Sequence, residues 1–183
     1  MEQKAATLTL EALCEAVREV EKQQFIDQYT GFFLVALGTL SVEEIRQTQR
    51  SRIPGLEPDD TLAVSFGDVL KHDAKQHPHR GQVFFLGGDT TTEFLVGRSA
   101  TCEITVDDPS VSDIQCVLKW VVKASSAELR VTDAGSTNGT MVNLERLPCQ
   151  VESRLVDEDI VSLGRCSFQA FSAAGLYDQL VQI

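Results

Sequence analysis

The sequence predicts a mainly β protein, an antiparallel β-sandwich that follows an N-terminal all-helical unit. From about residue 81 onward, short apolar runs alternate with turns rich in glycine, asparagine, aspartate and serine, which is typical of a sandwich of many short strands. Before residue 80 the apolar residues instead recur at three- and four-residue steps, which favours helices. We therefore expect a helical unit over residues 1–80, including a linker at 71–80, and a sandwich over residues 81–183.

Helices are expected over four N-terminal segments: residues 8–29, 32–40, 41–50 and 61–71. The first segment carries Leu13 and Val17 on an apolar face, opposite a charged face. The second is apolar almost throughout, as a buried helix would be. Ser41 and Glu44 have the spacing of a capping box, which predicts the start of the third helix.

The linker holds all three histidines, His72, His77 and His79. They could form a metal site, but no cysteine or ordered acidic residue stands at ligand spacing from them. We therefore interpret them as part of a polar linker and expect no metal and no cofactor.

The second half of the chain has the period of strands. Residues 82–86 and 94–97 flank a Gly87-Gly88-Asp89 turn and predict a hairpin or a corner. After Gln115, one face of a long strand is expected to carry Cys116, Leu118, Trp120 and Val122. Leu129 and Val131 are expected to face the core from the next strand. Further short strands are expected at residues 104–106, 159–163 and 167–171 and near residues 141 and 146, with a terminal helix over 175–183.

The charge and the cysteines restrict the class of protein. The net charge is −11, from 27 acidic and 16 basic residues, which argues against nucleic acid and against an anionic membrane as partners. Five cysteines without a Cys-x-x-Cys pair are typical of small buried residues in a reducing compartment. The longest apolar run is too short to span a bilayer, and the N-terminus lacks a signal pattern, so we expect a cytoplasmic protein.

Several polar segments lie where a β-protein places its loops. In chain order they are Gly97-Arg98, Ser112-Asp113-Ile114-Gln115, Ser136-Thr137-Asn138-Gly139-Thr140 and Val142-Asn143. Their order and spacing resemble the forkhead-associated (FHA) domain, and the resemblance covers about residues 81–172. It implies an FHA-type antiparallel β-sandwich and the recognition of a phosphorylated threonine.

The resemblance also implies a role for each loop residue. Arg98 and Ser112 would hold the phosphate, with help from Thr137, and Asn138 would bond the backbone of the bound peptide. A guanidinium suits this task because it offers two parallel donors and never deprotonates. Gly97 and Gly139 would be architectural, through close backbone approach or a positive φ.

Two positions depart from the family pattern. Gln115 replaces a histidine that supports the loop, and an amide can still donate and accept hydrogen bonds. Asp113 follows the phosphate-binding serine, at a position that is often basic or amide-bearing in the family. A carboxylate about 6 Å from a phosphate would repel it by about 0.7 kcal/mol per unit charge pair in water. At an effective dielectric constant of about 20 the repulsion would be about four times larger, so the expected cost is a ten- to hundredfold loss of affinity, at about 1.4 kcal/mol per tenfold.

Two hypotheses follow, and each has a condition. The first is a signalling adaptor that binds a phosphothreonine-containing partner, or a phosphorylated threonine of its own N-terminal unit. If Arg98 were locked in an internal ion pair, or if Asp113 filled the site, a docking platform would remain. That platform is the alternative: an FHA scaffold that mediates phosphorylation-independent contacts, or self-association through residues 1–80. An enzyme is not expected, because no catalytic motif is present and the candidate nucleophiles Cys102 and Cys116 fit a core.

Overall fold

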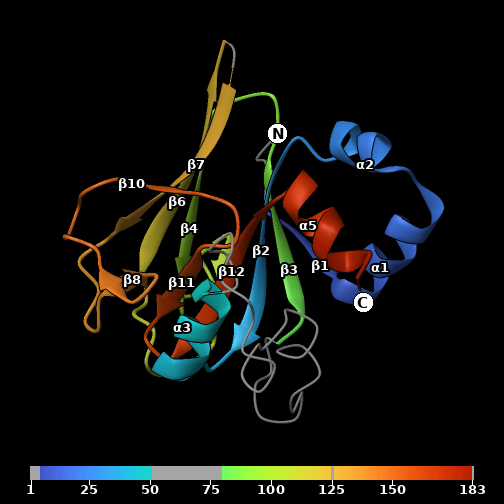
Figure 1. The fold of residues 1–183 in the computed structure, drawn as a ribbon. Coiled ribbons are helices and arrows are strands. Elements are labelled where there is room, and N and C mark those ends of the chain that lie inside the picture. Colours follow the sequence, from blue (N-terminus) through green and yellow to red (C-terminus); the bar gives the residue numbers. More distant parts are fainter. Residues whose placement is uncertain (1–4, 51–79, 125, 183) are drawn as a thin grey trace.

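The computed structural model describes residues 5–50, 80–124 and 126–182, and these residues form two β-sheets and a group of helices (Figure 1). The seven-stranded sheet contains, in spatial order, β1 (Ala6–Thr9), β3 (Gln82–Gly87), β2 (Gly31–Gly38), β12 (Cys166–Ser172), β11 (Ile160–Leu163), β8 (Thr140–Val142) and β9 (Glu145–Arg146). The five-stranded sheet contains β10 (Ser153–Leu155), β7 (Ser126–Asp133), β6 (Cys116–Lys123), β4 (Thr92–Gly97) and β5 (Ile104–Thr105).

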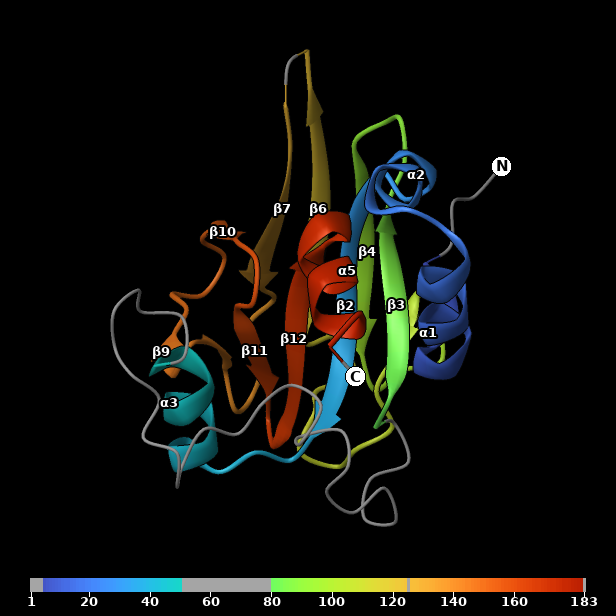
Figure 2. The ribbon, with the colours of Figure 1, turned by 45° about the vertical axis from the view of Figure 1, so that its right-hand side comes forward.

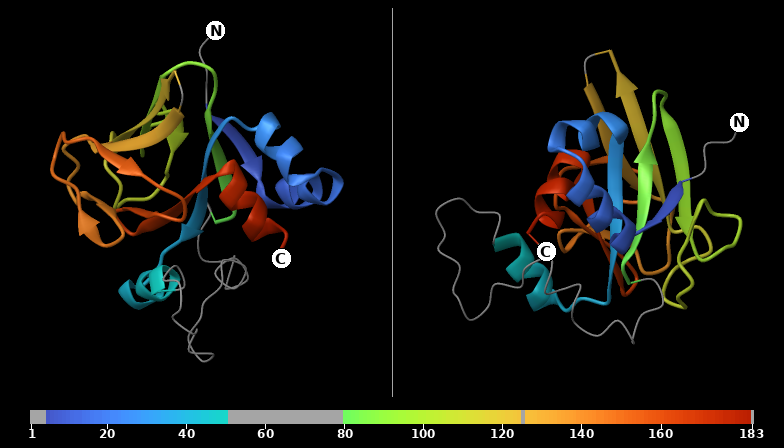
Figure 3. Two further views of the ribbon diagram at one scale, coloured as in Figure 1. Left: turned by 45° about the horizontal axis from the view of Figure 1, so that its top comes forward. Right: turned by 90° about the vertical axis from the view of Figure 1, so that its right-hand side faces the viewer.

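The strand pairs are antiparallel, except that β4 and β5 are parallel. The two sheets pack face to face, and the helices lie on the far side of the seven-stranded sheet (Figure 3). The predicted fold class, a mainly β antiparallel sandwich with helices in its N-terminal part, is confirmed. The N-terminal part is not all-helical as predicted, because it also contributes β1 and β2. The predicted turn at residues 87–89 is a corner, because it leads from β3 in one sheet to β4 in the other.

The core between the sheets follows the alternation that the sequence predicts. On β6, Cys116, Leu118 and Trp120 are buried while the residues between them are partly exposed. Leu129 and Val131 of β7 are also buried, as expected. Rows of such residues from both sheets exclude water from the interior and hold the loops at the strand ends in place.

A second core lies between the seven-stranded sheet and three helices: α1 (Leu10–Glu19), α2 (Lys22–Gln28) and α5 (Ala173–Leu180). Figure 2 shows α5 in front of β2 and β12, with α1 and α2 beside it. Leu13, Phe25 and Leu176 from the helices pack with Phe33 and Val35 of β2. The predicted terminal helix is therefore present as α5, with Leu176 and Leu180 buried.

Residues 32–40 are not the buried helix that we expect from the sequence. Residues 31–38 form strand β2, which lies between β3 and β12. Phe33 and Val35 face the helices, while Leu34 and Ala36 face the other sheet, so β2 is buried on both sides. A strand buried on both sides has a continuous apolar run, which periodicity alone does not separate from a buried helix.

The rest of the N-terminal part is only partly as predicted. Residues 8–29 form the end of β1 and two short helices rather than one helix, and the Thr9 hydroxyl accepts a hydrogen bond from the backbone N–H of Ala12 at the start of α1. The capping box is confirmed at α3 (Val42–Arg50), where the N–H of Ser41 donates to Glu44 Oε2 at 2.7 Å and the N–H of Glu44 donates to Ser41 Oγ at 3.2 Å.

Strands from both sides of residue 80, the boundary expected from the sequence, pair within one sheet. The helix predicted at residues 61–71 and the linker with His72, His77 and His79 lie outside the described residues. Within the described part of the chain, no helix is long and apolar enough to cross a membrane.

Candidate binding site

The polar loops singled out in the sequence meet at one end of the sandwich, where β4 ends at Gly97. The tip of the β6–β7 hairpin, after Lys123, lies at the opposite end (Figure 1). The N–H of Arg98 donates to the carbonyl oxygen of Ser112 at 2.9 Å, which joins the first loop to the second. A Cβ at Gly97 would lie 2.2 Å from the carbonyl oxygen of Asp113, so only glycine allows the two loops to approach this closely.

Gln115 connects the second loop to the third. Its side chain is fully buried, and its Oε1 accepts a hydrogen bond from the N–H of Ser112 at 3.0 Å. Its Nε2 donates to Ser136 Oγ at 2.7 Å and to the carbonyl oxygen of Gly139 at 3.0 Å. A buried amide satisfied on both sides is a strong constraint on its neighbours. Gln115 therefore links the second and third loops through hydrogen bonds of its buried side chain.

Asp133 organises the third loop, a role that we do not predict from the sequence. It is buried and accepts hydrogen bonds from the N–H of Gly135 at 2.9 Å, from Ser136 Oγ at 2.6 Å and from Thr140 Oγ1 at 2.7 Å. Burial alone would raise the pKa of this carboxyl, but the hydrogen bonds from Ser136, Thr140 and Gly135 outweigh it and lower the pKa. The signal in the sequence is an aspartate just before a Gly-Ser turn.

Ser112, Thr137 and Asn138 lie together at the loop tips. The Ser112 hydroxyl accepts a hydrogen bond from the N–H of Thr137 at 3.0 Å and lies 3.4 Å from Thr137 Oγ1. The Asn138 amide donates to the carbonyl oxygen of Ser110 at 2.7 Å, and no described residue donates to its side-chain oxygen. Thr137 and Asn138 are exposed and Ser112 is half-buried, so hydroxyl and amide groups face the solvent from a fixed framework.

Arg98 forms an ion pair with Asp113. Its Nη2 lies 2.8 Å from Asp113 Oδ1, and the two side chains are 45% and 76% exposed. The pair is intramolecular, so the condition stated for an internal ion pair is met in part, but it lies at the surface and has a single close contact. The sequence suggests a carboxylate that repels a phosphate from a distance. In the structure the Asp113 carboxylate instead accepts a hydrogen bond directly from Nη2 of the Arg98 guanidinium.

The segment that contains these loops matches a known domain family. Residues 94–164, which include all of these groups, match the sequence model of the FHA domain. These residues form an FHA domain. A search of curated proteins found no match to the chain.

Among solved structures, full-length yeast Pml1p is 16% identical with a TM-score of 0.51, and the match covers 93% of this chain and 96% of that one. This likeness in fold extends beyond the FHA domain to most of the chain. The FHA domain of the CT664 protein from Chlamydia trachomatis is 18% identical with a TM-score of 0.48, covering 78% and 97%. Mycobacterium tuberculosis EmbR in complex with a low-affinity phosphopeptide is 23% identical with a TM-score of 0.42, covering 50% and 22%.

An ion pair between a buried carboxylate and an exposed arginine joins the second loop of the FHA domain to the turn after β11. Asp108, whose side chain is 9% exposed, accepts hydrogen bonds from the N–H and the hydroxyl of Ser110 and from Arg165 Nε at 2.9 Å. Burial would raise the pKa of Asp108, but the bonds from Ser110 and the pairing with Arg165 outweigh it and lower the pKa to about 2. The carbonyl oxygen of Ser110 also accepts a hydrogen bond from the Asn138 amide. The cluster of Asp108, Ser110 and Arg165 therefore positions the loop tips.

Three of the cysteines have the character of core residues, whereas Cys149 is exposed. Cys102, Cys116 and Cys166 are buried, and burial raises the pKa of each thiol, that of Cys166 to about 11. A nucleophilic cysteine needs the opposite shift. The described part of the chain holds no cluster of histidine, cysteine or acidic residues that could bind a metal ion.

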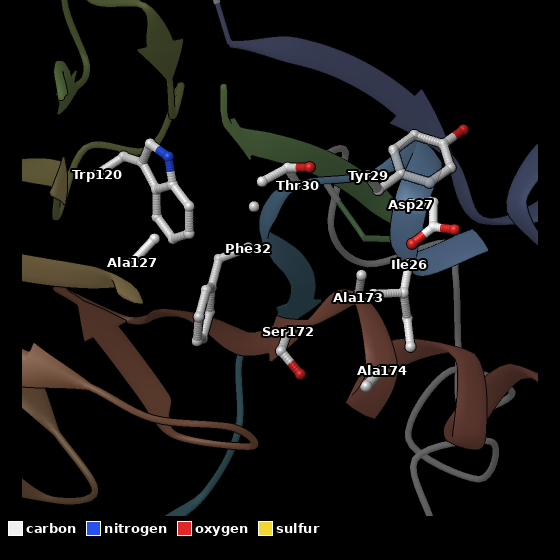
Figure 4. Close-up of a pocket in the computed structure, with 11 residues that line it drawn as sticks. Ile26, Asp27, Tyr29, Thr30, Phe32, Trp120, Ala127, Ser172, Ala173 and Ala174 are labelled. Atoms are coloured by element: carbon white, nitrogen blue, oxygen red, sulfur yellow. The ribbon is translucent and has the colours of Figure 1, made fainter. Parts of the chain in front are cut away.

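A separate hollow of about 490 Å³ opens at the other end of the sandwich (Figure 4). Trp120 and Phe32 border it from the two sheets, and Tyr29 and Ala173 border it from the helical side. Trp120 pairs with Thr92, at the start of β4, whereas the FHA loops follow the end of that strand. The hollow is therefore not part of the loop site.

Proposed function

We propose that this protein is a signalling adaptor that binds a partner protein through a phosphorylated threonine at the loops of its FHA domain. In this proposal Arg98 and Ser112 hold the phosphate, Thr137 adds a hydroxyl, and Asn138 bonds the peptide backbone. The observation that supports it best is that Arg98 already holds an anionic oxygen at 2.8 Å, at the edge of exposed hydroxyl and amide groups.

In this proposal Asp113, which belongs to the same chain, competes with the phosphate for Arg98. A phosphate dianion brings about twice the charge of a carboxylate and three acceptor oxygens, so it can displace Asp113 and also reach Ser112 and Thr137. An exposed ion pair contributes only about 0.2–1 kcal/mol, which a phosphate can overcome. The ion pair lowers the affinity for a phosphopeptide without removing the binding mode.

The test is a titration with a threonine peptide in phosphorylated and unphosphorylated form, monitored by fluorescence anisotropy. The phosphorylated peptide is expected to bind and the other is not. Arg98→Ala should abolish the binding, and Asp113→Arg should tighten it. Equal binding of both peptides, or binding of neither up to millimolar concentration, would contradict the proposal.

The same ion pair favours a second candidate, a docking platform that does not depend on phosphorylation. If Asp113 remained on Arg98, partners would bind elsewhere on the sandwich or on the N-terminal helices. Complexes that survive both phosphatase treatment and Arg98→Ala would support this candidate, and loss in either case would count against it. Self-association is a related possibility, which light scattering of the full chain would test directly.

A further inference from the structure

Among the residues that the structure describes, one cation at the loop end has no acidic partner. Arg146 lies on β9, directly opposite Met141 in the β8–β9 hairpin. It is exposed, and its guanidinium makes no ion pair or hydrogen bond with any described residue. The other described arginines of this end are paired, Arg98 with Asp113 and Arg165 with Asp108. In a chain of net charge −11, an unpaired guanidinium beside the loops is a notable exception.

The lack of a side chain at Gly139 leaves room for this guanidinium. A Cβ on Gly139 would lie 2.6 Å from Arg146 Nε and 2.7 Å from its Cζ, so the planar group rests where a side chain would otherwise project. Gly139 also has a φ of +81°, which glycine adopts at no steric cost. Because Gly139 follows Asn138 directly, Arg146 lies beside the residue assigned to the peptide backbone.

The hairpin that carries Arg146 is well anchored. The N–H of Leu147 donates to the carbonyl oxygen of Thr140 at 2.9 Å, and the N–H of Asn143 donates to that of Ile160 at 2.9 Å. Asn143 Nδ2 also donates to Asp159 Oδ1 at 2.8 Å. Little backbone freedom would be lost when a ligand engages Arg146. Glu145 does not neutralise it, because successive side chains of a strand point to opposite faces.

We infer that Arg146 is a specificity-determining residue that binds an acidic side chain of the partner peptide, near the phosphothreonine. This inference rests on the proposed function and narrows its ligand to phosphothreonine segments with a flanking aspartate or glutamate. Arg98 binds the phosphate, and Arg146 binds the acidic side chain near it. One solvent-exposed ion pair should raise the affinity about two- to fivefold.

The experiment uses the full chain and a set of peptides with one threonine, either phosphorylated or not. An aspartate, alanine or lysine is placed at each flanking position in turn, and binding is measured by anisotropy. The wild-type protein should prefer the phosphorylated peptide and, at one or a few positions, an aspartate. Arg146→Ala should lose the aspartate preference while it keeps the phosphate dependence. Arg146→Glu should reverse the preference toward lysine.

The controls separate the two proposals. Arg154→Ala removes an exposed arginine of the other sheet, on β10, and should leave the aspartate preference unchanged. Thermal melts would check that each variant is folded. If the wild-type protein shows no phosphate dependence, the proposed function fails and this inference fails with it. If phosphate dependence is present but the aspartate preference is absent, or persists in Arg146→Ala, only the inference about Arg146 is overturned.

Discussion

Replacing Asp113 with asparagine should strengthen the binding of a phosphothreonine peptide. The variant removes the carboxylate that pairs with Arg98 at 2.8 Å and keeps a side chain of the same shape. The backbone of residue 113 should not move, because its carbonyl oxygen accepts hydrogen bonds from the N–H of Ser99 and from Cys102 Sγ. The change in affinity should therefore report the carboxylate charge alone.

Two effects set the size of the gain. If the exposed ion pair contributes about 0.2–1 kcal/mol, Arg98 is free for roughly 15–40% of the time, and its release raises the affinity about two- to sixfold. Once displaced, Asp113 still lies about 6 Å from the phosphate and repels it by roughly 1–1.4 kcal/mol, or about five- to tenfold. Together they predict a gain of roughly ten- to seventyfold.

The measurement is a peptide titration by calorimetry at low and at high salt. Asp89→Asn is a suitable control, because it removes the same charge from the turn between β3 and β4, at the far end of β4. A six-residue strand is about 17 Å long, which exceeds the Debye length of about 8 Å at physiological salt. The gain for Asp113→Asn should shrink as the salt rises. A gain of less than twofold, or one that Asp89→Asn reproduces, would refute the reasoning.

Three further predictions concern the scaffold. Gln115→Leu should lower the free energy of unfolding by roughly 2–4 kcal/mol in a urea titration, because it leaves the N–H of Ser112 and the loop carbonyl of Gly139 without their buried partner. Asp108→Asn should cost about 2 kcal/mol near neutral pH. The pKa of Asp108 falls from 3.8 to about 2 on folding, so the carboxylate stabilises the fold above about pH 4, and its advantage over the variant should vanish as the pH falls to about 2. Residues 81–183 alone should fail to give a dispersed NMR spectrum, because the cut removes β2 from between β3 and β12.

The last of these predictions affects how the N-terminal region is tested. If the cut chain does not fold, loss of a partner on deletion of residues 1–80 would not locate the binding surface. Point variants on exposed faces of α1 are then the better test, because they leave β2 in the sheet. A dispersed spectrum for residues 81–183 would instead show that the sandwich tolerates the loss of a central strand.

The loop site could be predicted from the sequence because the order and spacing of its motifs are specific. Arg98, Ser112 and Thr137 are brought together by backbone pairing between strands whose alternation is plain, such as β6 and β7. Gly97 marks a close approach of two backbones and Gly139 marks a positive φ. Glycine is the residue that adopts both at low energetic cost. Such local signals can be recognised without knowledge of the tertiary structure.

The features that the sequence did not predict depend on contacts across the fold. The strand character of residues 31–38 arises because β2 is covered by helices on one side and by the other sheet on the other. The sequence shows only an apolar run, which suits a buried helix equally well. The pairing of Arg98 with Asp113 likewise depends on how two separate loops approach each other, and the position of Arg146 over Gly139 depends on the side-chain direction within the β8–β9 hairpin.

The ion pair at Arg98 changes which ligands the site can distinguish. A partner that offers a carboxylate in place of a phosphate would only exchange one carboxylate for another, and Asp113 is present at a high effective concentration because it is tethered to the same loop. A phosphate adds a second charge and further oxygens that reach Ser112 and Thr137, so it gains where a carboxylate does not. Competition by Asp113 lowers the affinity for every anion by the same factor, so a ligand that starts weaker falls below a useful affinity first. The aspartate thus raises the affinity that a ligand needs in order to occupy the site, at a cost to the phosphopeptide as well, and Arg146 would supply part of the attraction that Arg98 gives up.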